Sequence, residues 1–357
     1  MSLSERLRHT RENLGLTLQQ VADRVGLSAP TISAYETANR EPSFSHLTKF
    51  AKLYCRPIEY FFSEQVQPEE VVLWRAKPHS PAAAELEAKL LELGGLYRSL
   101  EVWFDCVRSV RLPQYNASWK DAVIMAASVR RTLGLGDRPG ASLEETLQEA
   151  GVKIFHLAFE PRPASASTVT ASFGPAILLN STADRRERTF SLAHELFHLL
   201  TWGKFEKGSV EGEAMADRFA DCLLLPDDAV RQAVDSYVRG GKLTLRELDL
   251  IAAGFDVPLA ALLRRLGDIL NLSKELGREI LLRAQGAGFS GKADWSQTPA
   301  SRPRRFVELA TKAYESGKLS LGRLAEYLGI TRQEAMKDFF HDGDGSIVDE
   351  EIQLTPA

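Results

Sequence analysis

The sequence predicts a mainly α-helical protein with one small β-sheet, an α+β chain. Three observations predict this class. The 357 residues correspond to two or three domains at about 150 residues each. The composition, with 44% hydrophobic and 26% charged residues, is typical of globular proteins with a proper core. Apolar residues recur at helical spacing along most of the chain, whereas β-rich stretches are confined to residues 152–179.

The composition also excludes several classes of function. A net charge of −4 rules out a basic coat over the whole chain, so any nucleic-acid contact must come from a local patch. No apolar run reaches about 18 residues, so neither a membrane span nor a membrane partner is expected. The polar, charged first residues do not have the pattern of a secretory signal. The three cysteines, Cys55, Cys106 and Cys222, are far apart and form no CxxC, which favours a reducing cytoplasm.

Changes in composition and hydrophobic pattern along the chain predict its domains. Residues 1–64 are a run of short helices, and residues 65–116 begin as a proline-containing linker and continue as a helical connector. Residues 117–230 combine helices with the β-rich stretches. Residues 231–340 are helical again and repeat a helix-turn-helix-like pattern, and residues 341–357 are rich in Gly and Asp and are expected to be a flexible tail.

The N-terminal segment has the pattern of two short helices joined by a tight turn. Thr17 and Gln20 form a capping box at the start of the first helix, Gly26 marks the turn, and Ser28 caps the second helix. A second helix that is exposed and polar suits entry into a DNA major groove, while the first helix can contact phosphates. The candidate DNA-contacting residues are Gln19, Gln20, Ser28, Thr31 and Ser33.

This segment resembles the XRE/Cro-type repressor domain over its whole length. The resemblance includes Ser33-Ala-Tyr-Glu36 and the turn Arg40-Glu-Pro-Ser43. It implies binding of double-stranded DNA through residues 1–64. Basic and acidic residues nearly balance here, so a single copy is expected to bind weakly. XRE-type modules commonly pair on palindromic sites, which makes a homodimer one option, but the sequence does not settle the oligomeric state. The alternative is a helical bundle used for protein contacts.

A candidate metal site lies at Ala193-His-Glu-Leu-Phe-His-Leu199. His194 and His198 are four residues apart and therefore share one face of a helix, from which both imidazoles can bind one Zn²⁺. Glu195 can reach the fourth, water-filled position, act there as general base and pass the proton to the leaving amine. The alternative for a lone buried histidine is a structural role, but the HExxH pattern is far more specific than a lone histidine.

A third ligand is required because catalytic zinc keeps three protein ligands and one open position. Glu213 is the preferred candidate, and Glu211 is its rival. Asp217 lies one turn beyond Glu213 and can accept the outer N–H of a ligand histidine. Ligand chemistry favours one Zn²⁺ per chain, with Mn²⁺ as the alternative.

The β-rich stretches 152–156, 169–173 and 176–179 predict a small antiparallel sheet before the metal-binding helix. A substrate segment would pair with an edge strand, for which 169–173 or 176–179 is expected to serve. Candidate donors to a developing oxyanion are His156, Arg185 and Arg188, and the sequence does not choose among them.

Together these residues resemble the ImmA/IrrE family of metallopeptidases. The similarity extends from about Trp119 to Pro226 and includes Arg186-Glu-Arg-Thr-Phe-Ser-Leu-Ala-His-Glu-Leu-Phe-His198 and Glu213-x-x-Ala-Asp-x-Phe-Ala-x-x-Leu-Leu-Leu-Pro226. Three positions depart from the family's usual residues without affecting the ligands: Phe197, Asp217 and Leu225. The resemblance implies a zincin-like fold, His194, His198 and Glu213 as ligands, and Glu195 as base.

The combined hypothesis is a cytoplasmic transcriptional regulator with zinc-dependent endopeptidase activity. The resemblance implies cleavage of a cognate helix-turn-helix repressor, which would switch on stress-response or mobile-element genes. The competing hypothesis is a non-catalytic DNA-binding regulator or antitoxin-like protein that uses the metallopeptidase fold as a sensor or interaction domain. Glu195 argues against that alternative, since a purely structural zinc site does not need this carboxylate.

Overall fold

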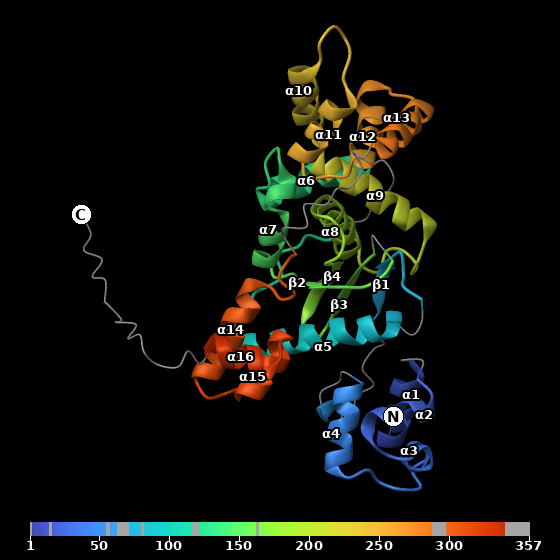
Figure 1. Ribbon diagram of the computed structural model, residues 1–357, viewed down its shortest axis with the longest axis vertical. Coiled ribbons are helices and arrows are strands. Elements are labelled where there is room, and N and C mark those ends of the chain that lie inside the picture. Colours follow the sequence, from blue (N-terminus) through green and yellow to red (C-terminus); the bar gives the residue numbers. More distant parts are fainter. Residues whose placement is uncertain are drawn as a thin grey trace, which may run out of the picture. The chain divides into compact units, whose positions relative to one another are not determined.

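In the computed structural model of the protein, the described residues form helices and one four-stranded sheet (Figure 1). The structure describes residues 2–13, 16–54, 58–62, 71–79, 82–115, 121–161, 164–287 and 298–339. The chain divides into two compact units, Met1–Pro303 and Arg304–Ala357. The expected tail, 341–357, lies outside the described residues. The α+β class predicted from the sequence is confirmed.

The elements of the first unit follow in chain order: α1 (Leu3–Asn13), α2 (Leu18–Val25), α3 (Ala29–Glu36), α4 (Phe44–Leu53), η1 (Ile58–Phe61), β1 (Val72–Arg75), α5 (Ala82–Trp103), α6 (Asp121–Leu133), η2 (Pro139–Ala141), α7 (Leu143–Glu149), β2 (Lys153–Leu157), β3 (Ser165–Thr170), β4 (Gly174–Asn180), α8 (Arg185–Leu200), α9 (Val210–Leu224), α10 (Asp227–Tyr237), α11 (Leu245–Gly254), α12 (Leu259–Leu270) and α13 (Lys274–Gly286). The second unit contains α14 (Arg304–Glu315), α15 (Leu321–Leu328) and α16 (Arg332–Phe339).

The sheet differs from the predicted one in two respects. Its strand order is β1-β3-β4-β2, and β2 pairs with β4 in parallel, so the sheet is mixed and not purely antiparallel. The strands expected at the edge, β3 and β4, lie inside the sheet. The edge beside β3 is taken by β1, which comes from the stretch predicted as linker and pairs antiparallel with β3. The four-residue strand was missed because its partner is almost a hundred residues away in the sequence.

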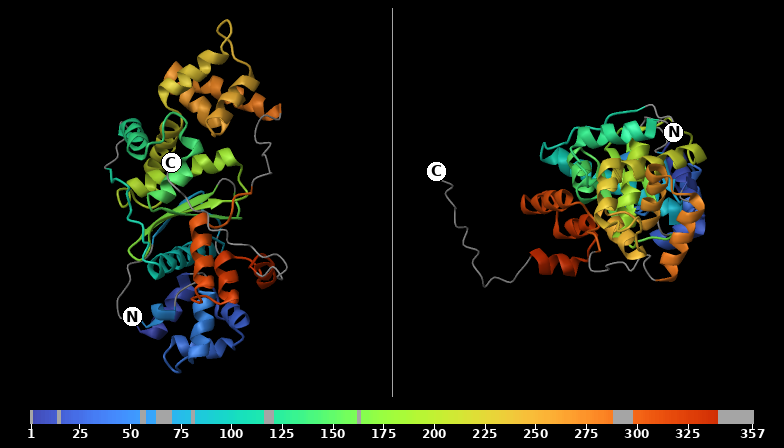
Figure 2. Two further views of the ribbon diagram at one scale, coloured as in Figure 1. Left: turned by 90° about the vertical axis from the view of Figure 1, so that its left-hand side faces the viewer. Right: turned by 90° about the horizontal axis from the view of Figure 1, so that it is seen from above.

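Helices cover both faces of this sheet. The α8 helix packs on one face against β3 and β4, and α5 packs on the other against β4 and β2, as Figure 2 shows from further directions. From Phe190 to Leu200 every residue of α8 is buried. The helix therefore lies in the middle of a single apolar core that also includes α6, α9, α11 and α12. This central position holds the residues of α8 in fixed directions.

The N-terminal helices form their own small core. Both helices of the predicted pair begin with the expected caps, because Thr17 and Gln20 form a capping box and Ser28 accepts a hydrogen bond from the amide of Thr31. Gly26 ends α2 with φ at 68°, a left-handed conformation that favours glycine. These local signals set the angle between α2 and α3, which is the defining feature of a helix-turn-helix.

The second unit repeats this local design. Ser320 caps α15, Gly329 ends it with φ at 72°, and Thr331 and Glu334 form reciprocal hydrogen bonds at the start of α16. The helices α15 and α16 each have 8 residues, as α2 and α3 do. Residues 304–339 thus contain a pair of short capped helices, and their helix-turn-helix-like character stays a prediction.

Among the described residues, no helix combines the length and the apolar character that crossing a bilayer requires.

The close packing of α5 on the sheet predicts opposite effects for two adjacent glycines. A Cβ at Gly94 would lie 2.6 Å from the buried ring of Phe173, whereas a Cβ at Gly95 would meet no atom within 4 Å. We expect Gly94→Ala to lower the free energy of unfolding by about 1–3 kcal/mol through overpacking. Gly95→Ala should raise it by up to about 1 kcal/mol. Urea denaturation of the two variants beside the wild type measures both, and equal midpoints would contradict this packing.

Candidate metal centre

The two histidines owe their positions to the local design of α8. Asp184 caps the helix by accepting a hydrogen bond from the amide of Glu187 at 2.9 Å. His194 and His198 follow on one face, with exposed fractions of 1% and 6%. Because both are buried in an interior that water hardly reaches, their ring nitrogens need partners from the protein or a bound ion.

Glu213 comes from the neighbouring helix α9, which Ser209 caps at its N-terminus. The helices α8 and α9 make extensive contact. The small residues Ala216 and Ala220 are fully buried, as expected for a helix that approaches its neighbour closely. This packing brings a carboxylate 19 residues away from His194 in the sequence to the face that carries both histidines.

The three candidate ligand residues meet at one point, where each imidazole lies close to a different oxygen of Glu213. Nε2 of His194 lies 3.2 Å from Nε2 of His198 and 3.1 Å from Oε2 of Glu213, and Nε2 of His198 lies 3.4 Å from Oε1 of Glu213. Ligands of a tetrahedral zinc ion, at bond lengths of 2.0–2.1 Å, are about 3.3 Å apart. The residue types and the spacing therefore fit one divalent ion with one position left open.

The outer nitrogen of His194 has a partner of its own. Its Nδ1 lies 2.8 Å from Oδ1 of Asp217, one turn beyond Glu213 on α9. A carboxylate in this place fixes the tautomer, so that Nε2 presents its lone pair to the metal position. Arg75 of β1 extends the network, since one guanidinium nitrogen lies 3.7 Å from the same Asp217 oxygen and another donates to Ser191 Oγ at 3.0 Å.

The electrostatics of this cluster favour a cation. Burial opposes ionisation of Glu213, but its hydrogen bonds with His194 and His198 outweigh burial and lower the pKa of the carboxyl to about 2. Burial lowers the pKa of His194, yet the hydrogen bonds with Asp217 and Glu213 reverse this, and the net shift is upward. Positive charge, as a proton or as a metal ion, is thus stabilised at this point.

The side chain of Glu195 lies between α8 and strand β3. Its side chain is fully buried, and its two oxygens accept hydrogen bonds from Ser165 Oγ at 2.7 Å and from Ser167 Oγ at 2.6 Å. Sequence reasoning missed both serines. The sequence does show that Ser165 and Ser167 share one face of a strand, because residues two apart in a strand point to the same side. It does not show that this strand packs against α8. An ionised carboxylate offers about four lone pairs, so two hydroxyl donors leave acceptor capacity for a further partner.

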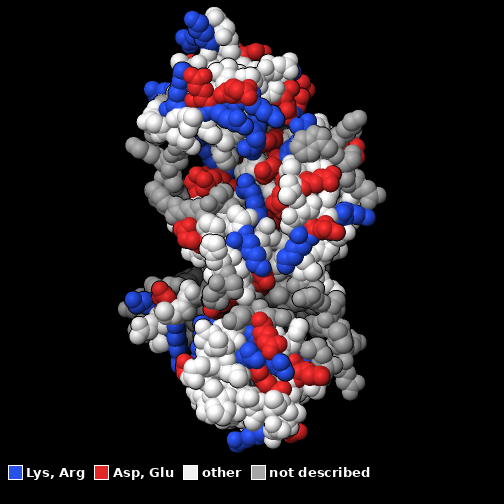
Figure 3. Space-filling view, turned by 90° about the vertical axis from the view of Figure 1, so that its right-hand side faces the viewer, with Lys and Arg blue, Asp and Glu red and all other residues white. Residues whose placement is uncertain are grey.

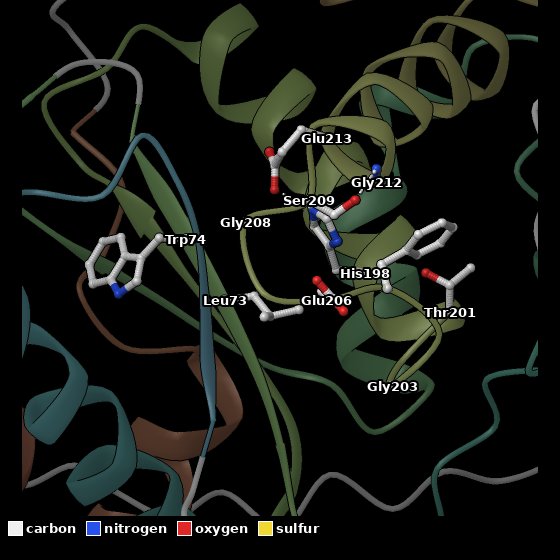
Figure 4. A pocket seen from close by; sticks show the side chains of 11 residues that line it. Leu73, Trp74, His198, Thr201, Gly203, Glu206, Gly208, Ser209, Gly212 and Glu213 are labelled. Carbon is white, nitrogen blue, oxygen red and sulfur yellow. Dashed lines mark hydrogen bonds and ion pairs between the residues drawn. The ribbon is translucent and has the colours of Figure 1, made fainter.

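A narrow pocket opens beside the candidate ligands. It is lined by His198 and Glu213, by the loop from Gly203 to Ser209, and by Leu73 and Trp74 of β1. Figure 4 shows Leu73 extending from β1 toward the ligand side of the pocket and Trp74 extending to the opposite side of the strand. The strand missed in the sequence therefore forms one wall of the site.

The other sequence candidates lie away from the pocket. Glu211, the rival third ligand, is exposed and is not part of the cluster. His156 lies on β2, the far edge strand, and bonds Glu144 at 3.0 Å. Arg185 pairs with Asp256, and Arg188 donates to the backbone oxygen of Ala183. None of His156, Arg185 and Arg188 lines the pocket beside His198 and Glu213. The structure therefore does not support any of them as the oxyanion donor.

The residues proposed to contact DNA lie on α2 and α3 or their caps. Gln19 is exposed and donates to Asp23 at 2.8 Å. Gln20 is exposed, but its Oε1 accepts a hydrogen bond from the amide of Thr17 at 2.8 Å. Ser28 is exposed at the cap of α3, and Thr31 and Ser33 are half-buried along it. The structure brings all five to two adjacent helices, with Gln20, Ser28 and Thr31 already engaged in capping.

Glu36 has a structural position in the same domain. Arg11 of α1 donates to both of its oxygens, at 2.7 and 2.8 Å, and the pair is largely buried. This bidentate contact ties α1 to α3. On the face of the protein drawn in Figure 3, basic and acidic side chains of the described residues are interspersed.

The geometry defines a class: a helix-turn-helix domain joined to a metallopeptidase-like domain with an HExxH helix. Residues 2–59 match the family described as Helix-turn-helix domain, and residues 147–267 match the family described as IrrE N-terminal-like domain, Peptidase_M78. This chain therefore carries an XRE-type helix-turn-helix domain followed by an ImmA/IrrE-type domain. β1 lies between the two matched regions.

Curated relatives are similar over shorter stretches. The HTH-type transcriptional regulator PuuR of Escherichia coli (strain K12) is 30% identical over 103 residues, 28% of this chain and 56% of the relative. An uncharacterized transcriptional regulator in the ATPase CF(0) region of Rhodospirillum rubrum is 36% identical over 74 residues, 20% of this chain and 68% of the relative. The chain thus spans about half to two thirds of their lengths. The crystal structure of ComR from Streptococcus suis matches 95% of each chain, but with 13% identity and a TM-score of 0.17, too low to support an inference.

The ligand cluster predicts which carboxylate on α9 holds the metal. We expect His198→Ala and Glu213→Gln each to abolish binding of one Zn²⁺ per chain, because two donors cannot hold the ion as three do. Asp217→Asn should weaken binding about 10- to 100-fold through loss of the outer hydrogen bond. Elemental analysis and chelator competition measure both effects. Glu211→Gln is the matched control and should bind like wild type; loss of metal in that variant alone would refute the assignment.

Proposed function

We propose that this protein is a DNA-binding transcriptional regulator whose second domain is a zinc-dependent endopeptidase. The observation that carries the proposal is the cluster of His194, His198 and Glu213, with Glu195 directly after the first histidine. Zn²⁺ is the preferred metal, with Mn²⁺ as the alternative. When bound, such an ion supplies a Lewis acid and lowers the pKa of a water molecule.

The chain's own residues provide the remaining chemistry. Glu195 accepts the proton of the attacking water and returns it to the leaving amine. Ser165 and Ser167 hold its two oxygens, so that the carboxylate does not rotate away from the reacting atoms. Asp217 holds His194 in the tautomer that coordinates through Nε2.

The substrate proposed is a protein, a cognate helix-turn-helix repressor. Cleavage would derepress stress-response or mobile-element genes, and the protein would act in the cytoplasm, where its DNA and substrate are. DNA binding through residues 1–64, as a homodimer, is proposed to position or restrict the peptidase. The relatives named as transcriptional regulators support the regulatory half of this proposal.

A specific observation favours a second candidate function. Glu195 is fully buried and already accepts two hydrogen bonds, which is also what a structural carboxylate would show. In that case the domain would be a non-catalytic sensor or interaction module of a DNA-binding regulator. Removal of the charge of Glu195 without loss of metal distinguishes the two candidates.

We expect Glu195→Gln to retain zinc and to slow cleavage of the cognate helix-turn-helix repressor by about 10²–10⁴-fold, the usual contribution of a general base. Immunoblots of the repressor co-expressed with each variant measure the rate of cleavage. Glu187→Gln, the same change on the same helix but outside the site, should cleave like wild type. If wild type and Glu195→Gln leave the repressor equally intact, the sensor function is the correct one.

For DNA binding we expect Gln19→Glu and Ser33→Glu each to reduce affinity about tenfold or more, since each places a carboxylate near phosphates. Gel shifts with the DNA upstream of the gene, at several salt concentrations, measure this. Gln232→Glu, an exposed position on α10, makes the same charge change elsewhere and should leave affinity unaltered. Salt-insensitive or absent binding by the wild type would instead indicate protein contacts for residues 1–64.

A further inference from the structure

β1 occupies the side of the sheet that borders the metal centre. It runs antiparallel to β3, with Val72 opposite Thr168, Leu73 opposite Ser167 and Arg75 opposite Ser165. β3 is the strand whose serines hold Glu195. β1 therefore pairs with the strand that contacts the candidate general base. It occupies the edge of β3 to which an additional strand, such as a bound peptide, would otherwise pair.

A peptide substrate would need this same position. Extended peptides bind to sheets by adding a strand to an exposed edge, where main-chain hydrogen bonds hold them and alternate side chains enter pockets. In a peptidase with its HExxH helix on the sheet, antiparallel addition beside that helix aligns the peptide with the metal. β1 has both properties, since it is antiparallel to β3 and its Leu73 lines the pocket beside His198 and Glu213.

Besides the main-chain pairing with β3, side-chain contacts of its last three residues hold β1 in place. Leu73 lies against the pocket. Trp74 is 9% exposed, donates from Nε1 to Glu87 at 2.7 Å and packs edge-on against Phe159. Arg75 reaches Ser191 and Asp217 across the metal side. Trp74 thus anchors β1 to α5 on one side of the sheet, whereas Leu73 and Arg75 make their contacts on the side of the metal centre.

In the sequence, β1 lies outside the matched IrrE-like region. The matched IrrE-like region begins at residue 147, whereas β1 ends at Arg75, between that region and the helix-turn-helix domain. A segment tethered in the same chain competes with free peptides at an effective concentration in the millimolar range. A bound β1 would therefore exclude most peptides from β3.

We propose that β1 is a resident pseudosubstrate strand, which occupies the substrate edge of β3 and must leave before an extended segment of another protein can pair there. This rests on the proposed peptidase function. It makes the connector after the helix-turn-helix domain the element that controls access to the metal centre. The occupant that replaces β1 is an extended segment with an apolar side chain at the position of Leu73.

Two opposite changes test the proposal in the full chain. Trp74→Ala removes the anchor on α5 and keeps Leu73 and Arg75, whose side chains contact the pocket and Asp217. Val72→Cys with Thr168→Cys places a cross-strand pair in register, and its disulfide would lock β1 onto β3. The control for the first is Trp103→Ala, at the end of α5 and outside the sheet. The control for the second is the same double variant after reduction with a phosphine.

The first readout is binding of a short apolar peptide hydroxamate to the zinc-loaded protein. We expect Trp74→Ala to bind it at least tenfold more tightly than wild type, and the oxidised double variant to bind it at least tenfold more weakly than its reduced form. The second readout, hydrogen exchange of the amides of residues 165–170, should be faster in Trp74→Ala. It requires neither metal nor turnover.

The proposal is overturned if the oxidised and reduced double variants bind the hydroxamate equally, or if Trp74→Ala binds it more weakly, because β1 would then be a permanent wall of the site. The double variant decides the matter even if Trp74→Ala does not fold. Tighter hydroxamate binding by Trp74→Ala without cleavage of any repressor would support the pseudosubstrate role and reject the peptidase function, so the two failures are distinguishable.

Discussion

The close packing of α8 against α9 is the constraint on which the rest of the metal centre depends. Two histidines on one helix provide only two ligands, and the third must come from a different helix. The small side chains of Ala216 and Ala220 allow α9 to lie close to α8, so that Glu213 contacts both imidazoles. With a bulkier residue at either position the helices would separate, and the three donor atoms would no longer fit the coordination sphere of one ion.

The sheet contributes as much to the site as the helices do. β3 presents Ser165 and Ser167 to Glu195, and β1 presents Leu73 to the pocket and Arg75 to Asp217. These contacts connect the connector after the helix-turn-helix domain to the residues around the metal position.

The helix-turn-helix elements show how much structure local sequence can specify. Thr17 with Gln20, Gly26 and Ser28 begin and end their helices by contacts within four residues, and Ser320, Gly329 and Thr331 do the same in the second unit. Because these capping signals are local, both helix pairs could be located from the sequence. The buried pair of Arg11 and Glu36 that ties α1 to α3 could not, since its partners are 25 residues apart.

The sequence by itself determined the α+β class, the helix-turn-helix, and the helix on which His194, Glu195 and His198 lie, because helical periodicity and caps act over a few residues. Only the tertiary structure decided three features: the mixed strand directions of the sheet, the pairing of β1 with β3 at the edge of the sheet, and the contact of Ser165 and Ser167 with Glu195. Strand partners are chosen by packing between distant segments, so a strand of four residues has no local signature that states its neighbour or its direction.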